Sequence, residues 1–401
     1  MHFIKKNILC IAFAAIAVQA LPAKTLSSAP DTLGKFDAEM LGFETRPGYV
    51  LPTKAFFRGE NAMGKPIRNA LSAHLRYSFK FSGNTRLGRL YPGAYQGIGM
   101  SYDSFSDANE IGRPVAIYLF QGAPFAHLGQ DMTFGYEWNF GASFGWKKYD
   151  AETNPFNDVV GSYINAYIDL GLTFHWQFSS NWNLVAGIDI THYSNGNTNY
   201  PNYGVNLVGG KLGIARSFGA VSGYQAGKSQ SRHSETLKPY LSCDIVLYGS
   251  TKRKGINWPD ASYLVPGSFG IAGMNINPMW GFNKYFKAGA SVDAQYDESA
   301  NIKDHLAGTA HSGDLKFYRP PFREQFAVGI SARAELTMPL FSVNMGIGRN
   351  VIFKGEDTDC YYQILALKVS VTHNTFIHIG YQLSSFHKPN NLMIGLGYRF
   401  R

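Results

Sequence analysis

The sequence predicts an all-β fold, an antiparallel transmembrane β-barrel, and three observations lead to this prediction. Of the 401 residues, 45% are hydrophobic and 15% aromatic, whereas only 16% are charged. Disordered chains have the opposite balance, and soluble domains carry about 25% charged residues. No apolar run after residue 20 reaches the roughly 18 residues that a membrane helix needs. Polar and apolar residues instead alternate over long segments, which is typical of strands in a membrane barrel.

Residues 1–20 have the pattern of a secretory signal peptide. Lys5 and Lys6 form a short positive region, Ile8–Ala17 is an apolar core, and Val18-Gln19-Ala20 is a small-residue cleavage site. We therefore expect export through a cleaved signal peptide and a final location in the bacterial cell outer membrane.

The rest of the chain divides by composition into two parts. Residues 21–68 are rich in Pro and Gly, and we expect them to form a periplasmic lead-in or plug segment. Residues 69–401 alternate with period two, and we expect them to form one barrel domain. The net charge is +9, and the Lys and Arg residues are scattered through turns. This distribution favours anionic lipid head groups over nucleic acid as the partner.

Alternation is regular enough to give each strand an inner and an outer face. In the segment 71–81, Leu71, Leu75 and Tyr77 share one parity with further apolar residues, and polar residues take the other. Successive side chains of a strand point to opposite faces. Segments 132–146 and 164–178 repeat the pattern over ten residues or more, the length of a tilted membrane strand rather than of a soluble sandwich strand.

The sequence predicts about 14 strands, within a range of 12 to 16, because single-chain barrels have an even number. Val115–Gln121 is apolar on both parities, so it is excluded from this count. On that count His192 ends about the fifth strand. Both termini of such barrels lie in the periplasm, so the loop after an odd-numbered strand is expected to be extracellular.

Polar residues interrupt the outer face at one place. Leu184, Ala186, Ile188 and Ile190 form the outward parity of their strand, and the same parity carries His192 and Ser194 outward. The parity of Val208 and its neighbours on the next strand carries Asn206 outward as well. Polar side chains facing lipid are costly and indicate function.

These three residues have the chemistry of a nucleophilic site. A serine hydroxyl needs a base to take its proton, and a histidine needs a third group to hold its tautomer. We expect Ser194 to be the nucleophile, His192 the base and Asn206 the group that orients the histidine. The alternative is that Ser194 merely opens a polar loop, with His192 at the head-group boundary, because Asn195-Gly196 is a strong turn signal.

The segment His192-Tyr193-Ser194-Asn195, followed by Pro201-Asn202-x-Gly204, resembles the active-site motif of outer-membrane lipid A 3-O-deacylases. The resemblance implies a lipid-facing triad in which His192 is the base and Ser194 the nucleophile. It places Asn195 and Asn202 on asparagines of the motif, as oxyanion or structural support. The glutamate of that family falls on Asn206, so the acid is missing.

The spacing also resembles that of outer-membrane phospholipases A, which use His-x-Ser-Asn-Gly with an asparagine as the third member. In that pattern Asn206 is the expected orienting residue. The wider segment with Pro201 and Asn202 is closer to the deacylases.

Together these features predict an outer-membrane serine esterase that hydrolyses acyl esters of a membrane lipid. Lipid A or lipopolysaccharide is the leading substrate, and a phospholipid is the alternative. We expect no cofactor, whereas a phospholipase would imply calcium. A non-catalytic pore or structural barrel that retains the motif is the alternative from another class. Charges of inward parity, such as Glu137, Asp169, Asp189, Arg333 and Glu335, either line a pore or form satisfied interior networks.

Overall fold

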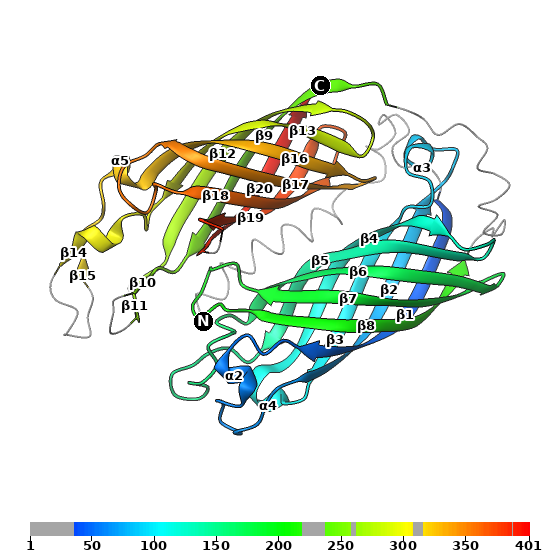
Figure 1. Cartoon of the computed structure of the whole chain (residues 1–401), viewed down its shortest axis with the longest axis horizontal. Coiled ribbons are helices and arrows are strands. Elements are labelled where there is room, and N and C mark those ends of the chain that lie inside the picture. The colour runs from blue at the N-terminus through cyan, green and yellow to red at the C-terminus, as the bar shows by residue number, and fades with distance from the viewer. Residues whose placement is uncertain (1–35, 219–236, 258–261, 308–315, 387) are drawn as a thin grey trace, which may run out of the picture.

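In the part of the chain that the structure describes, sixteen long strands close into two separate antiparallel barrels of eight strands each (Figure 1). The computed structural model describes residues 36–218, 237–257, 262–307, 316–386 and 388–401. The predicted signal peptide lies outside the described residues. In the described ranges, no helix is long and apolar enough to cross a membrane.

The first barrel has the strand order of the sequence and closes by pairing its last strand with its first. It consists of β1 (Phe36–Val50), β2 (Asn69–Phe81), β3 (Tyr95–Phe105), β4 (Gly112–His127), β5 (Met132–Trp146), β6 (Ile164–Ser179), β7 (Trp182–Ser194) and β8 (Val205–Phe218).

The second barrel closes in the same way, by pairing β20 with β9. It consists of β9 (Tyr240–Lys252), β12 (Phe269–Gly281), β13 (Phe286–Asp297), β16 (Phe326–Thr337), β17 (Phe341–Ile352), β18 (Tyr361–Ser370), β19 (Thr375–Ser384) and β20 (Lys388–Phe400).

Short elements occupy the connections between the barrel strands. The helices are α2 (Ala55–Arg58), α3 (Arg86–Leu90), α4 (Ala108–Ile111), α5 (Phe322–Gln325) and the 3-10 helix η2 (Ile302–His305). Two small hairpins pair β10 (Gly255–Asn257) with β11 (Ser262–Leu264), and β14 (Leu306–Ala307) with β15 (Lys316–Phe317).

The prediction of an all-β antiparallel membrane barrel is confirmed, and the strand number lies at the upper end of the predicted range. Two boundaries are corrected. Residues 36–50 form the barrel strand β1, so a lead-in or plug over 21–68 is wrong for that part of the segment. Residues 69–401 form most of two barrels rather than one, because β8 hydrogen-bonds to β1 and thereby closes the first sheet before β9 begins.

The segment excluded from the strand count is also a barrel strand. Residues 115–121 lie in β4, with Tyr118 and Phe120 buried inside the barrel and Ile117 and Leu119 exposed outside. Both faces are apolar because the interior is filled by aromatic side chains at this level. Since β1 and β4 were both missing from the count, His192 moves from the fifth strand to the seventh, which is again an odd-numbered strand.

Because successive strands run in opposite directions, β1, β3, β5 and β7 all finish at the same end of the first barrel. This is the end opposite Phe36, where β1 begins. Residues 51–68 with α2, residues 147–163 and residues 195–204 therefore gather at that end (Figure 1). Long loops are extracellular and short turns periplasmic in bacterial barrels, and the turn at residues 180–181 is the shortest connection of this barrel. We therefore assign the loop after β7 to the extracellular side.

The interior of the first barrel is filled by ion pairs rather than open. Glu137 accepts hydrogen bonds from Arg76 at 2.7 Å and from Lys211 at 3.1 Å. Arg46 pairs with Asp169 at 3.2 Å and with Asp189 at 3.5 Å. An eight-stranded barrel has an interior just wide enough for side chains. These charges therefore form a satisfied interior network. This was one of the two interpretations of the sequence, the other being the lining of a pore.

The second barrel has the same kind of interior. Glu335 accepts hydrogen bonds from Lys287, Lys368 and Arg399 at 3.2, 2.5 and 2.9 Å. Arg333 pairs with Asp293 at 2.7 Å. Buried charges need such partners, because an unpaired ion in a barrel core would carry a large desolvation cost. The named interior charges of both barrels are thus structural.

Candidate active site

The candidate site lies on the outer wall of the first barrel, where β7 and β8 approach the extracellular loop that joins them. In the register of this pair, His192 stands directly opposite Asn206. The neighbouring outward residues of this pair are exposed, at 59% for Ile190 and 44% for Val208. Side chains two residues apart share a face, so His192, Ser194 and Asn206 lie on the lipid-facing side.

His192 and Asn206 form a direct hydrogen bond. The distance from His192 Nδ1 to Asn206 Oδ1 is 2.7 Å. An amide oxygen only accepts, so Nδ1 carries the proton and Nε2 is the basic nitrogen. The backbone of Asn206 is held as well, since its carbonyl accepts from the Leu51 N–H at 2.9 Å. This arrangement fixes one imidazole tautomer and leaves the base nitrogen available.

Ser194 is half-buried and follows His192 on the same face. Within the described residues, no hydrogen bond joins its hydroxyl to His192. Catalytic hydrogen bonds are often long without substrate and tighten in the complex. The structure thus brings His192 and Asn206 together and places Ser194 beside them without the final contact.

Asn195 and Asn202 are joined through the loop between β7 and β8. The side-chain oxygen of Asn202 accepts from the backbone N–H of Asn195 at 2.9 Å. The carbonyl of Asn195 accepts from both the N–H and the hydroxyl of Thr198, at 3.3 and 2.9 Å. Asn195 is only 4% exposed, and its side-chain Nδ2 has no hydrogen-bond partner among the described residues. The two asparagines therefore shape the turn that follows Ser194.

Gly204 is a site residue whose role the sequence did not indicate. A Cβ at this position would lie 3.1 Å from His192 Cε1, 3.6 Å from Ser194 Cβ and 2.7 Å from the Tyr193 carbonyl oxygen. Its φ of +73° is in the left-handed region that favours glycine. The motif Pro201-Asn202-x-Gly204 contained the residue, but only the folded loop brings its backbone against the His192 ring.

The loop before β6 holds the loop after β7 in place through hydrogen bonds. Gly204 N–H donates to the Val159 carbonyl at 3.0 Å, and Asn199 Nδ2 donates to the Gly161 carbonyl at 2.6 Å. Asn157 Oδ1 in turn accepts from the Val160 N–H at 3.0 Å. Partial burial raises the pKa of Asp158 in this loop, and the positive charge of Lys54 opposes that rise. Two extracellular loops thus form one hydrogen-bonded unit around the site.

Replacement of Gly204 by alanine is expected to lower any Ser194-dependent activity by roughly 100-fold while the barrel still folds. The added methyl group meets the Tyr193 carbonyl and forces the His192 ring or the loop to move, and displacements near 1 Å cost about this much. Turnover and heat-modifiable gel migration check the two parts. Gly64→Ala is the matched control, because Gly64 also has a positive φ of 62° but has nothing within 4 Å of its Cβ position.

Two closed barrels with apolar outer walls, one of which carries a polar cluster at its lipid-facing rim, define an integral outer-membrane β-barrel protein. Residues 71–215 match the family model described as lipid A 3-O-deacylase (PagL). Residues 241–401 match the model described as acyloxyacyl hydrolase, C-terminal domain. The first barrel is therefore similar to lipid A 3-O-deacylases (PagL), and the second barrel is similar to the C-terminal domain of acyloxyacyl hydrolases. The resemblance to the lipid A 3-O-deacylase family is confirmed.

Solved structures of outer-membrane barrels are also similar to this chain. The crystal structure of the outer-membrane enzyme PagL has 13% identity and a TM-score of 0.31, covering 43% of this chain and 97% of its own. The N-terminal barrel of Pseudomonas aeruginosa OprF has 12% identity and a TM-score of 0.25, covering 45% and 97%. A search of curated proteins finds no significant match.

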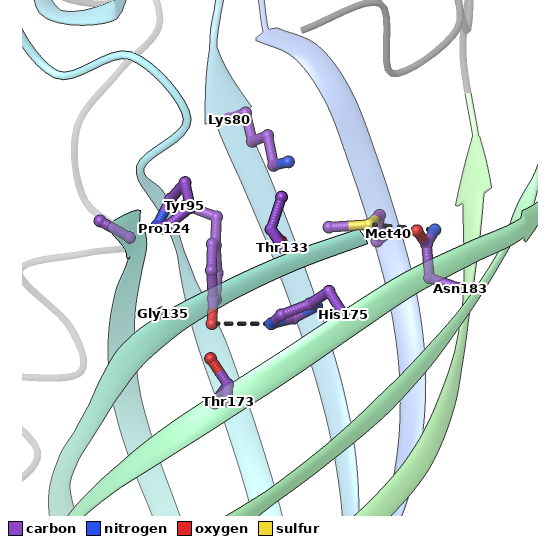
Figure 2. Close-up of a pocket in the computed structure, with 10 residues that line it drawn as sticks. Met40, Lys80, Tyr95, Pro124, Thr133, Gly135, Thr173, His175 and Asn183 are labelled. Carbon is purple, nitrogen blue, oxygen red and sulfur yellow. Dashed lines mark hydrogen bonds between the residues drawn. The ribbon is translucent and has the colours of Figure 1, made fainter. Parts of the chain in front are cut away.

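A pocket inside the first barrel is distinct from this site. It lies in the interior at the opposite end of the strands, where Tyr95, Thr173 and His175 point toward one another (Figure 2). Tyr95 Oη is 3.2 Å from His175 Nε2 and donates to the buried Glu137 at 2.9 Å. The barrel wall separates this interior pocket from the outward-facing His192.

Proposed function

We propose that the chain hydrolyses an ester-linked acyl chain of lipid A at Ser194, on the outer face of the first barrel. The observation that carries this proposal is the 2.7 Å contact between His192 Nδ1 and Asn206 Oδ1 on a lipid-facing surface, with Ser194 next on the same face. A base with a fixed tautomer beside a hydroxyl is the arrangement that acyl transfer to serine requires.

The reaction has two halves. His192 Nε2 takes the proton of Ser194 as its Oγ attacks the ester carbonyl, and the protonated imidazole then gives the proton to the departing sugar alcohol. Water deacylates Ser194 by the same route, with His192 again as base, and releases the fatty acid. Asn206 Oδ1 holds the Nδ1–H throughout and so keeps Nε2 directed at the reacting atoms. As an amide it orients the imidazolium but gives it no charge stabilisation.

Of the two loop asparagines, we assign Asn202 to the oxyanion and Asn195 to the loop. Asn202 uses its oxygen to hold the Asn195 N–H, which leaves its Nδ2–H₂ group to donate. Asn195 follows Ser194 directly, so its side chain points away from the lipid-facing side and is buried. Removing an oxyanion donor typically costs about 100- to 1,000-fold in turnover.

The position of the site favours lipid A as substrate. Ser194 lies where β7 meets an extracellular loop, at the level of the outer leaflet. Exposed apolar side chains below it, such as Ile188 and Ile190, give an acyl chain a surface to lie along. We expect no cofactor, since proton transfer and orientation are supplied by side chains in the steps above. The location follows as the bacterial outer membrane.

The test is mass spectrometry of lipid A and phospholipids from mixed vesicles incubated with the purified full chain. Each lipid is followed with EDTA or with calcium, and Ser194→Ala serves as the inactive control. Loss of an acyl chain from lipid A in EDTA supports the proposal. Calcium-dependent phospholipid cleavage would favour the phospholipase alternative. Channel conductance without cleavage of either lipid would identify a non-catalytic barrel.

A further inference from the structure

The loop that contains the candidate site rests on the second barrel. Asn197 Nδ2 donates to the Asn390 carbonyl on β20 at 3.0 Å, and the Arg253 N–H at the end of β9 donates to the Asn197 carbonyl at 3.4 Å. The loop after β7 accordingly lies beside the first residues of β20 in Figure 1. Asn197, three residues after Ser194, is thus in contact with a residue 193 positions further along the chain.

Gly196 also packs against β20. Its φ is +62°, and a Cβ at this position would lie 2.4 Å from both Cγ and Cδ2 of Leu392. Leu392 points outward from β20 and is half-buried, whereas Ile394 and Leu396 on the same face are 52% and 62% exposed. The site loop therefore covers the outer end of a strand face that is otherwise left to lipid.

Contacts along the rest of the barrels fix this arrangement. Trp138 on β5 packs edge-on against Phe341 on β17, with ring centroids 5.0 Å apart. At the periplasmic end Tyr91 Oη donates to the Lys284 carbonyl at 2.7 Å, and the Tyr91 ring packs 5.5 Å from that of Tyr285. Contacts toward both ends keep one barrel from turning against the other, so β20 stays in place under the loop.

We propose that the second barrel is a positioning element of the active site, which holds the loop of Ser194 through Leu392, Asn390 and Arg253. This inference rests on the proposed function. Ser194, Asn195 and Asn202 all belong to or border the loop that β20 contacts, and a 1 Å displacement of reacting groups is enough to slow a reaction strongly. The second barrel would therefore control turnover without touching the substrate's reacting atoms.

The alternative is that the two barrels merely pack together. The two roles differ in what a small change at Leu392 does. Simple packing predicts the same effect from any outward residue of β20 that loses its side chain. A positioning role predicts slower chemistry at Ser194 with unchanged substrate binding, and only where the loop is contacted.

The experiment uses the full chain with Leu392→Ala, the conservative variant Leu392→Met, and Leu396→Ala as the matched control on the same face. Asn197→Gly removes the side-chain donor to Asn390, and glycine tolerates the positive φ of 67° at this position. Three quantities are measured: kcat and KM for lipid A, the rate at which a fluorophosphonate labels Ser194, and hydrogen exchange of the amides of residues 195–204.

We expect Leu392→Ala and Asn197→Gly each to lower kcat and the labelling rate by roughly 10-fold with KM unchanged, and to speed exchange in the loop. Leu392→Met and Leu396→Ala should behave as the wild type. The inference is overturned if all four variants match the wild type while acyl release still depends on Ser194. Acyl release that does not depend on Ser194 instead overturns the proposed function, and the inference with it.

Discussion

Ser194→Ala is expected to lower release of fatty acid from lipid A by about 10,000-fold, and His192→Ala by a similar factor. Without the hydroxyl no acyl-enzyme forms, and without the imidazole no group beside Ser194 takes its proton. What activity remains would come from binding of the lipid and from the Asn202 amide. Both changes leave the barrel interior untouched, because Ser194 and His192 face outward.

The double variant, with both Ser194→Ala and His192→Ala, tests whether the two residues act together. If the two residues act as a unit, removing both costs no more than removing either, so the three variants should have the same residual rate. Leu71→Ala is the matched control, since Leu71 is an exposed outward residue of β2 and lies outside β7 and β8, which carry the site. Rates are measured on lipid A in vesicles with equal amounts of folded barrel, judged by heat-modifiable gel migration.

Additive losses would contradict the assignment. They would mean that His192 acts apart from Ser194, for example by binding the lipid head group. Full activity of Ser194→Ala would remove Ser194 from the chemistry altogether.

Strand faces were predictable from the sequence because alternation is a local property. The outward parity assigned to Ile188 and Ile190 agrees with their exposure in β7. Strand β1 escaped prediction because Gly42, Pro47 and Gly48 look like turn formers. Pro47 is tolerated there: it pairs with Leu71 on β2 but is skipped in the pairing with β8, where a missing N–H does no harm.

Closure of the sheet could not be predicted in the same way. Alternation determines which side chains face inward, but not which strands are neighbours. The pairing of β8 with β1 joins residues such as Ile214 and Phe43, whose sequence patterns carry no sign of each other. A division into two barrels therefore became visible only in the structure.

The candidate site was predictable where it depends on parity and not where it depends on loop structure. His192 and Ser194 share a face because they are two residues apart, and Asn206 meets His192 because both are the outward residues of paired strands. Gly204 and Leu392 were missed, since their contacts arise from a turned loop and from another barrel. No periodic pattern in the sequence encodes either contact.

Asn206→Leu is expected to lower kcat for lipid A by about 100-fold and to leave KM nearly unchanged. Leucine branches at Cγ as asparagine does and suits the lipid-facing surface, but it cannot accept the hydrogen bond that His192 Nδ1 now donates at 2.7 Å. The imidazole would then populate both tautomers and rotate, so Nε2 would rarely meet Ser194 as a base. Loss of the correct tautomer is costly in serine hydrolases of other folds.

Asn206→Asp separates the two possible contributions of this position. It keeps the acceptor and adds the negative charge that the deacylase motif supplies with its glutamate. A carboxylate stabilises the imidazolium that forms during the reaction, so we expect activity equal to the wild type or up to about 10-fold higher. A charge on the lipid face near the interface costs only about 0–1 kcal/mol, so the barrel should still fold.

Val208→Leu is the matched control for both variants, because Val208 is the next outward residue of β8 and does not contact His192. Equal activity of the leucine variant and the wild type would show that another group orients His192, and Asn206 would lose its assigned role. Low activity of both the leucine and the aspartate variants would mean that the amide nitrogen of Asn206 matters instead, since only that group is absent from both. The expected order, aspartate at or above asparagine and leucine far below, follows only if the oxygen that faces Nδ1 is what the site needs.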